Sequence, residues 1–199
     1  DPQSCNSISH CRSPLPYYIE KRRINADTSV RLRRVVAVAR TYVITGAASG
    51  IGAATSVLLQ ERGAKVIGVD IHNTDINADL STSRGRKDAA RSAVKLSGGS
   101  IDGIIPCAGL VHSNAKTVSV NFFGVTEFLT ELLPTLKNSL APRVAITSSM
   151  ASLLPNSPEL VNAMLANDEA GALVIAQGLV DQGPEKAGLI YGSTKRALS

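Results

Sequence analysis

The chain has 199 residues, 44% of them apolar and 4% aromatic, with a formal net charge of +5. This length and apolar content suit a single α/β domain with one core. The excess charge lies in residues 1–40, which carry eight Lys/Arg and three Asp/Glu, whereas residues 41–199 carry thirteen of each. A neutral main body argues against nucleic-acid and membrane partners, and we expect neither.

Residues 1–38 are predicted to be a disordered basic extension, because they show no sustained apolar period. They contain no apolar segment long enough for a signal peptide or a membrane helix. Three other interpretations stay open. These are a transit peptide, which acidic residues such as Glu20 disfavour, a nucleic-acid-binding arm with only Tyr17 and Tyr18 to stack, and upstream sequence ahead of a true start near Val38.

From residue 39 onward, we expect one nucleotide-binding domain in which strands and helices alternate. Strands are expected at 42–45, 66–69, 75–78, 101–106 and 143–147, and helices at 51–62, 83–96 and 117–138. In the first helix Ile51, Ala54 and Leu58 share a face, and the long helix buries Phe122, Val125, Phe128, Leu129, Leu132 and Leu136. The alternation predicts a doubly wound parallel sheet of the Rossmann-like α/β class, with ligands at the carboxyl ends of the strands.

A glycine-rich turn, TGAASGIG at residues 45–52, joins the first strand to the first helix. Glycine lets the backbone approach a pyrophosphate, and the helix N-terminus presents N–H groups and a positive dipole to it. We therefore expect dinucleotide binding by Gly46, Ser49, Gly50, Ile51 and Gly52.

The second strand ends at Asp70, eighteen residues after Gly52. A carboxylate there can accept both hydrogen bonds of an adenosine ribose and would repel a 2′-phosphate. No basic residue stands at Ala47, Ala48, Ser49 or Ile71 to neutralise that phosphate. The expected cofactor is NAD, with NADP less favoured.

Further motifs follow the glycine loop and Asp70 in a fixed order: Asp79-Leu80, Cys107-Ala108-Gly109, Asn121, Ser149 and Tyr191-x-x-x-Lys195. Through them residues 40–199 resemble the short-chain dehydrogenase/reductase family. Within the family, residues 78–82, 118–124 and the stretch between Ser149 and Tyr191 resemble bacterial 3α-hydroxysteroid dehydrogenase/carbonyl reductases and coniferyl-alcohol-dehydrogenase-like members.

The resemblance implies that Asp79 and Leu80 border the adenine, although Asp79 by itself fits a helix cap equally well. Cys107 takes the place of the family's usual asparagine, and Ala108 and Gly109 leave room for the cofactor backbone. From its residue type and its place after an apolar strand, Cys107 is expected to pack as a small hydrophobic side chain. The three cysteines show no disulfide or zinc pattern, which agrees with a cytoplasmic protein.

Hydride transfer to a carbonyl requires a proton donor at the developing alkoxide. Tyr191 is expected to be this general acid/base, because the ammonium of Lys195 one helical turn away stabilises a phenolate. In the family such a lysine also holds the nicotinamide ribose. Ser149 is expected to orient the substrate oxygen, with Ser148 as its rival. The resemblance gives Asn121 the role of anchoring a water that relays protons to the lysine.

Forty-one residues separate Ser149 from Tyr191, against about a dozen in most of the family. We expect residues 150–190 to form a helical insertion, with a Ser157-Pro158 start signal and apolar stripes along 159–167 and 169–181. The stripes comprise Leu160, Val161, Met164, Leu165, Leu173, Val174, Leu179 and Val180. They fit a satellite core as well as they fit a lid or a surface that alters subunit pairing.

The chain ends at Ser199, two turns into the expected catalytic helix, and so resembles a C-terminally truncated member of the family. The expected function of the whole protein is NAD(P)-dependent interconversion of a secondary or aryl alcohol and its carbonyl compound, by a homodimer. The alternatives are a non-catalytic dinucleotide-binding regulatory protein and an inactive truncated product.

Overall fold

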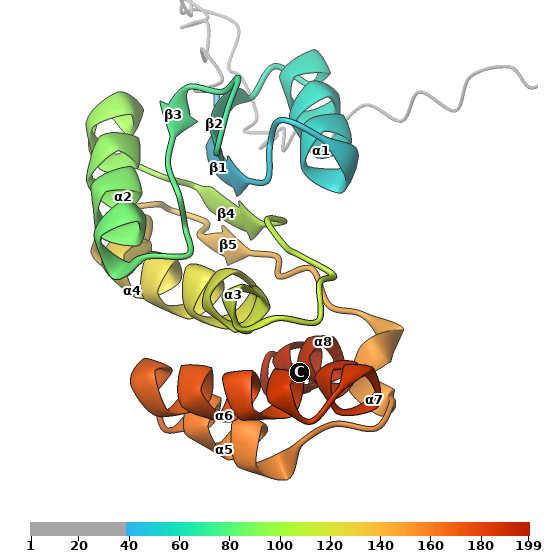
Figure 1. The fold of residues 1–199 in the computed structure, drawn as a ribbon. Helices are drawn as coiled ribbons and strands as arrows, with labels where there is room; N and C mark the ends of the chain where they lie inside the picture. The colour runs from blue at the N-terminus through green and yellow to red at the C-terminus, as the bar shows by residue number, and fades with distance from the viewer. Residues whose placement is uncertain (1–38) are drawn as a thin grey trace, which may run out of the picture. The chain divides into compact units, whose positions relative to one another are not determined.

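Parallel strands form one sheet, in the order β3-β2-β1-β4-β5, in the computed structural model, which describes residues 39–199 (Figure 1). The strands are β1 (Thr41–Thr45), β2 (Lys65–Asp70), β3 (Ile76–Asn77), β4 (Gly103–Pro106) and β5 (Arg143–Val144). The predicted Rossmann-like class is confirmed. The expectations for residues 1–38 lie outside the described residues.

The strand order places a ligand crevice at β1. The chain runs outward from β1 to β2 and β3, then crosses back to β4, which pairs with the other side of β1. The connection that follows β1 therefore leads toward β2, whereas the connection that follows β4 leads the opposite way, toward β5. Such a switch point is where doubly wound sheets bind their ligands.

Helices cover both faces of this sheet. Figure 1 shows α1 (Gly50–Glu61) on one face, with α2 (Ser83–Ser97) and α4 (Gly124–Leu136) on the other. The main core lies between the sheet and the latter pair, where Ile67, Ile104 and Phe128 are among the buried side chains. Glycine ends α2 as expected, since Gly98 takes a left-handed conformation with φ 74°.

The face of α1 that carries Ile51, Ala54 and Leu58 is not a buried face in the described residues. Ile51 is 66% exposed and Leu58 46% exposed. The buried residue of this helix is Gly52. The helix packs beside β1 and β2, and its apolar spacing alone does not identify the side that faces the sheet.

The predicted helix over residues 117–138 is interrupted. It begins as α3 (Ala115–Val118), continues as a π-helical turn η1 (Ser119–Phe123) and ends as α4. π-Helical turns occur frequently at functional sites. The expected apolar face is otherwise present, with Phe122, Val125, Phe128, Leu132 and Leu136 buried.

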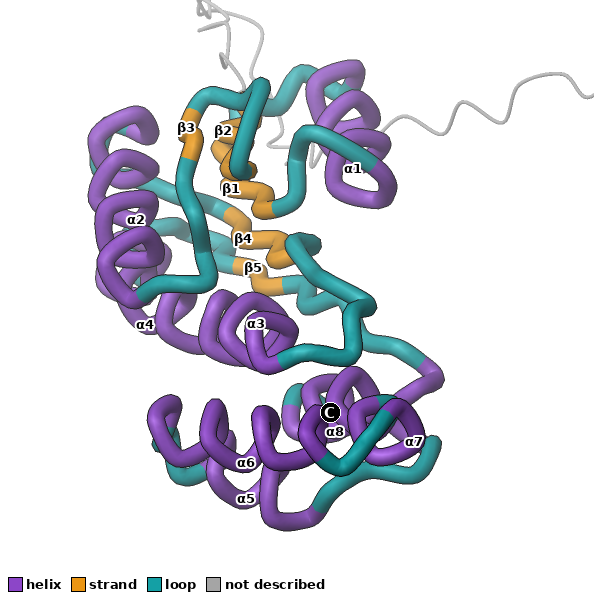
Figure 2. The backbone as a smooth tube through the Cα atoms, viewed as in Figure 1, coloured by secondary structure: helices purple, strands orange, loops and turns teal. Residues whose placement is uncertain are grey.

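Helices also form after the fifth strand, as expected. Figure 2 shows loop and helix from residue 150 onward: η2 (Met150–Leu153), α5 (Pro158–Leu165), α6 (Glu169–Asp181), α7 (Pro184–Ala187) and α8 (Leu189–Ala197). The side chain of Ser157 caps α5 by accepting a hydrogen bond from the Leu160 N–H at 3.3 Å.

We call residues 158–187 the helical segment. It forms a second core together with η1 and α8, in which Leu160, Met164 and Leu179 are buried with Phe122 and Ile190. Of the predicted apolar stripes, Leu165 and Val174 are instead 63% and 73% exposed. A satellite core, one of the two interpretations left open for these stripes, is present. The small residues Ala172 and Ala176 supply most of the buried face of α6.

The fifth strand is shorter than expected and ends at Val144 rather than at Thr147. Val144 and Ile146 are 44% and 41% exposed, since only β4 pairs with β5 among the described strands. In residues 39–199 there is no helix with the length and apolar character needed to cross a membrane.

Candidate cofactor site

The glycine loop forms a tight backbone cradle between β1 and α1. Gly46 has φ +70°, and a Cβ atom there would lie 2.7 Å from the Ala108 nitrogen. A Cβ on Gly52 would lie 2.2 Å from the Gly46 carbonyl oxygen. Only glycine fits at both positions, so the turn and the first turn of α1 pack directly on each other and on the backbone at Ala108, two residues beyond β4.

Ser49 is the N-cap of α1, but its side chain makes no capping hydrogen bond among the described residues. The first N–H groups of any α-helix have no partner within the helix. Backbone donors and one hydroxyl group therefore remain available beside the cradle. Such an arrangement fits the pyrophosphate of a dinucleotide.

Asp70 lies at the carboxyl end of β2 and braces the same loop. Its Oδ2 accepts a hydrogen bond of 3.0 Å from the Ala48 N–H, and its Oδ1 accepts one of 2.6 Å from the Ile71 N–H. The carboxylate is thereby fixed at the edge of the cavity that the loop borders.

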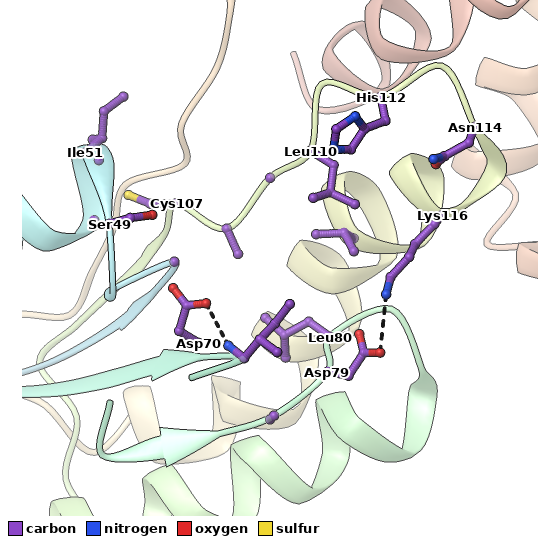
Figure 3. A pocket seen from close by; sticks show the side chains of 18 residues that line it. Ser49, Ile51, Asp70, Asp79, Leu80, Cys107, Leu110, His112, Asn114 and Lys116 are labelled. Atoms are coloured by element: carbon purple, nitrogen blue, oxygen red, sulfur yellow. Dashed lines mark hydrogen bonds and ion pairs between the residues drawn. The ribbon is translucent and has the colours of Figure 1, made fainter. Parts of the chain in front are cut away.

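The cavity has a volume of about 610 Å³ and lies at the carboxyl ends of the strands (Figure 3). All the residues predicted to bind the cofactor outside the catalytic helix line it: Gly46, Ser49, Gly50, Ile51, Gly52, Asp70, Asp79, Leu80, Cys107, Ala108 and Gly109. A cavity of this size is typical of a small-molecule or cofactor site. The residues present thus fit a dinucleotide.

Asp79 forms part of the wall opposite the glycine loop and is not a helix cap. The cap of α2 is Thr82, whose Oγ1 accepts a hydrogen bond from the Gly85 N–H. Asp79 Oδ1 instead accepts one of 2.9 Å from the Ser81 N–H. Hydrogen bonds from Ser81 and, to a lesser degree, the charge of Lys116 hold the pKa of the Asp79 carboxyl below its ordinary value.

Cys107 is half-buried and lines the cavity, so it does not pack simply as a small hydrophobe. Its Sγ accepts a hydrogen bond of 3.3 Å from the Thr147 Oγ1. The thiol thus connects β4 to the chain beyond β5, at a position where the family has an asparagine side chain.

The residues proposed for proton chemistry do not line this cavity. Tyr191 and Lys195 lie on α8, which packs against η2, where Ser149 is the N-cap. Ser149 Oγ accepts a hydrogen bond of 3.1 Å from the Ala151 N–H, whereas Ser148 is exposed and its Oγ lies 3.3 Å from that of Ser199. The structure therefore brings Ser149 and α8 together at one side of the cofactor cavity.

Lys195 is almost completely buried, with 7% of its surface exposed. Its Nζ donates a hydrogen bond of 2.9 Å to the Thr147 carbonyl and lies 5.9 Å from the centre of the Tyr191 ring. Burial lowers the pKa of the Lys195 ammonium below its usual value, while the nearby Cys107 acts in the opposite direction.

Asn121 lies in the π-helical turn η1 and is buried. Its side chain pairs with the backbone of Leu110, accepting from the N–H at 2.7 Å and donating to the carbonyl at 2.8 Å. It also donates to Thr194 Oγ1 at 3.3 Å, on α8. Asn121 thus joins one wall of the cavity to the helix of Tyr191 and Lys195.

Several lining residues were not expected from the sequence: Ile71, Ala78, Leu110, His112, Asn114, Lys116 and Val120. Lys116 Nζ lies 3.5 Å from Asp79 Oδ2, so an ion pair joins two walls of the cavity (Figure 3). Five of these seven residues lie between the end of β4 and η1 inclusive. The rule that ligands bind at carboxyl ends of strands, applied beyond Gly109, would have indicated them. The described residues contain no group of His, Cys, Asp and Glu that could hold a metal ion.

Comparison with known proteins identifies the class to which this fold and cavity belong. Residues 40–161 match the short chain dehydrogenase family. The chain is 38% identical over 162 residues to the 3-alpha-hydroxysteroid dehydrogenase/carbonyl reductase of Comamonas testosteroni, covering 79% of this chain and 62% of that protein. It is 26% identical over 133 residues to the asnovolin H dehydrogenase of Aspergillus novofumigatus, covering 56% and 52%.

Solved structures give the same result. The crystal structure of the 3-alpha-hydroxysteroid dehydrogenase from a Pseudomonas species, complexed with NADH, is 41% identical and superposes with a TM-score of 0.73, over 79% of this chain and 68% of that one. Menthone neomenthol reductase from Mentha piperita is 19% identical with a TM-score of 0.64, covering 81% and 83%, and shares the fold.

This chain belongs to the short-chain dehydrogenase family. The resemblance predicted from the order of its motifs is confirmed, including its similarity to hydroxysteroid dehydrogenase/carbonyl reductases. The chain spans 62% of the length of the Comamonas enzyme and 52% of the Aspergillus enzyme.

Proposed function

We propose that the protein is an NAD-preferring oxidoreductase that interconverts a secondary or aryl alcohol and its carbonyl compound. The observation that carries this proposal is the glycine cradle beside Asp70, because a Cβ at Gly46 or Gly52 would collide with backbone. A dinucleotide bound there would supply the hydride acceptor or donor. Its pyrophosphate would lie at Ser49–Gly52, its adenosine ribose at Asp70 and its adenine near Asp79 and Leu80.

NAD is preferred over NADP in this proposal because Asp70 would repel a 2′-phosphate. The carboxylate is held in place by the Ala48 and Ile71 N–H groups, so it cannot easily turn away. Lys116, the cavity's one lysine or arginine among the described residues, is paired with Asp79 on the adenine side. No cation therefore balances Asp70 at the ribose in the described residues.

The proton chemistry is assigned to α8 and η2. Tyr191 would exchange a proton with the substrate oxygen as general acid or base, and the Lys195 ammonium would stabilise the phenolate. Ser149 would orient the substrate oxygen by a hydrogen bond. Asn121 contacts Thr194 on α8, so it would hold the catalytic helix in register with the cavity wall, consistent with its proposed place in a proton relay.

The substrate is proposed to be apolar around its alcohol or carbonyl group. Met150, Leu153 and Leu154 follow Ser149 directly, and their side chains are 80%, 78% and 56% exposed. Apolar side chains of this size at a surface are typical of a ligand-binding or interaction site when they are contiguous. We propose that they contact the body of the substrate.

A second function, dinucleotide binding without catalysis, is favoured by one observation. Ser149, Tyr191 and Lys195 do not line the cavity that the cofactor residues form. Both functions require NAD binding, so turnover distinguishes them. The proposed homodimer and the boundaries of a domain from residue 39 onward, with an insertion at 150–190, remain predictions.

The test is a titration of the protein with NAD and with NADP, followed by assays of NADH formation with secondary and aryl alcohols. We expect NAD to bind at least about tenfold more tightly than NADP, which corresponds to 1.4 kcal/mol, and at least one alcohol to be oxidised. Tight NAD binding with no turnover on any alcohol or carbonyl compound would favour the regulatory function. Failure to bind either dinucleotide would contradict both.

A further inference from the structure

Arg86 on α2 is the largest fully buried side chain of the described residues, with no exposed surface. Its guanidinium forms ion pairs with Glu127 on α4 and with Glu169 in the first turn of α6. The contact with Glu169 involves both carboxylate oxygens, with Nη1 lying 3.2 Å from Oε1. A buried guanidinium requires such partners, and a two-bond pair fixes its orientation as well as its charge.

The same guanidinium reaches the wall of the cofactor cavity. Arg86 Nη1 donates to the carbonyl of Leu80 at 3.2 Å and to the carbonyl of Ser119 at 3.3 Å. Leu80 lines the cavity and is 5% exposed. A Cβ added to Gly124 would lie 3.4 Å from the Ser119 oxygen and 3.5 Å from the Leu80 oxygen. The two carbonyls therefore converge on one closely packed point.

The two carboxylates around Arg86 are not equivalent. Glu127 also accepts a hydrogen bond of 2.6 Å from Ser83 Oγ and has Lys87 Nζ at 3.5 Å. Glu169 has no cationic partner but Arg86 in the described part of the chain. Without the Glu169 charge, the guanidinium would be drawn toward Glu127 and would lose the pair that keeps its Nη1 edge at Leu80.

We infer that Arg86 is a positioning residue for the adenosine end of the cofactor cavity, and that Glu169 of the helical segment holds it in that position. The inference rests on the proposed dinucleotide binding and extends it. No residue of α5–α7 lines the cavity. The helical segment nevertheless supports the wall at Leu80 through one partly buried ion pair, that of Glu169 with Arg86, which is a role distinct from a lid.

The experiment compares the unmutated full chain with Glu169→Gln and with Glu159→Gln. Glu159 is the matched control, since it is the first-turn acidic residue of α5 in the same helical segment and forms no ion pair among the described residues. Two probes are titrated separately, ADP-ribose and nicotinamide mononucleotide. Hydrogen exchange of the α6 amides is measured with and without ADP-ribose.

Glu169→Gln is expected to weaken ADP-ribose binding about fivefold or more and to change nicotinamide mononucleotide binding less than about twofold. Glu159→Gln is expected to change neither. By reciprocity, ADP-ribose should slow exchange in α6 in the unmutated protein and less so in Glu169→Gln. A merely structural role would weaken both probes alike.

Equal loss of both probes, or unchanged ADP-ribose affinity in Glu169→Gln, would overturn the inference while leaving the proposed function intact. If the unmutated protein binds neither ADP-ribose nor NAD, the proposed function fails, and the inference fails with it. The readout is independent of turnover, so an inactive but dinucleotide-binding protein gives a decisive result.

Discussion

The Nζ atom of Lys195 on α8 donates a hydrogen bond of 2.9 Å to the main-chain carbonyl of Thr147, beyond the end of β5. The hydroxyl of the same Thr147 donates to Cys107 Sγ at 3.3 Å, at the end of β4. These two bonds tie the helix of the Tyr-x-x-x-Lys motif to the strand ends that border the cofactor cavity. The lysine of the motif therefore has a hydrogen-bond partner in the described residues, the Thr147 carbonyl, that connects two parts of the fold.

Lys195→Met is expected to abolish turnover with a change of less than about 1 kcal/mol in the free energy of unfolding at pH 7. The lost hydrogen bond to Thr147, worth about 1 kcal/mol, is offset because the buried ammonium is no longer desolvated. Chemical denaturation and a steady-state assay measure the two effects. Lys186→Met, on the exposed surface of α7, is the control and should preserve both. A large loss of stability in Lys195→Met would show that the lysine is mainly structural.

Tyr191→Phe is expected to lower the turnover number about 100-fold or more and to leave the NAD dissociation constant nearly unchanged, because only the proton-donating oxygen is removed. Tyr42→Phe removes a phenolic oxygen from β1, away from α8, and is expected to keep full activity. Substantial turnover of the Tyr191→Phe variant at saturating substrate would mean that another group supplies the proton.

Asp70→Ala is expected to narrow the ratio of NAD to NADP affinity by about tenfold, since the charge that repels a 2′-phosphate is lost. The substitution would also lower the affinity for NAD itself. Part of that loss would arise because the Ala48 N–H loses the carboxylate to which it donates in the glycine loop. Isothermal titration with both dinucleotides measures the ratio. Asp88→Ala, a half-buried substitution on α2 that lies outside the cavity lining, should leave it unchanged. Tighter NADP than NAD binding by the unmutated protein would contradict the assignment of Asp70.

Gly52→Ala and Gly178→Ala are expected to change the stability of the fold in opposite directions. A Cβ at Gly52 would lie 2.2 Å from the Gly46 oxygen, so this change should destabilise the fold by at least about 1–3 kcal/mol and weaken NAD binding. A Cβ at Gly178, inside α6, meets nothing within 4 Å. Alanine there should stabilise the helix by about 0.5–1 kcal/mol. Thermal unfolding checks both, and a stable, NAD-binding Gly52→Ala variant would show that the cradle is looser than described.

Asp102→Asn is expected to reduce the acid sensitivity of the fold. Hydrogen bonds, first from Ser139 and then from the Thr41 N–H, hold the pKa of the Asp102 carboxyl below its ordinary value. Such a group stabilises the folded state above its unfolded-state pKa of about 3.9, and this stabilisation is lost as pH falls through the lower folded-state pKa. Urea midpoints measured from pH 6 to pH 3 should fall less steeply in Asp102→Asn than in the unmutated protein. Parallel curves would contradict this contribution.

The sequence by itself determined the parallel α/β class and the presence of a glycine loop between the first strand and the first helix. It also determined the place of Asp70 at the end of the second strand and the presence of helices between Ser149 and Tyr191. These features depend on local properties: the conformational freedom of glycine, the alternation of strand and helix, and a Ser-Pro helix start. Local signals are sufficient there because neighbouring residues along the chain create the structure.

Only the tertiary structure decided which helix faces are buried and which distant residues meet. The apolar spacing of α1 did not show that Ile51 and Leu58 are exposed, because burial depends on what packs against a face. The ion pair of Arg86 with Glu169 joins residues 83 positions apart, and the Lys116–Asp79 pair crosses a cavity. Such contacts depend on how strands and helices are brought together, so the spacing of residues within one helix or strand does not predict them.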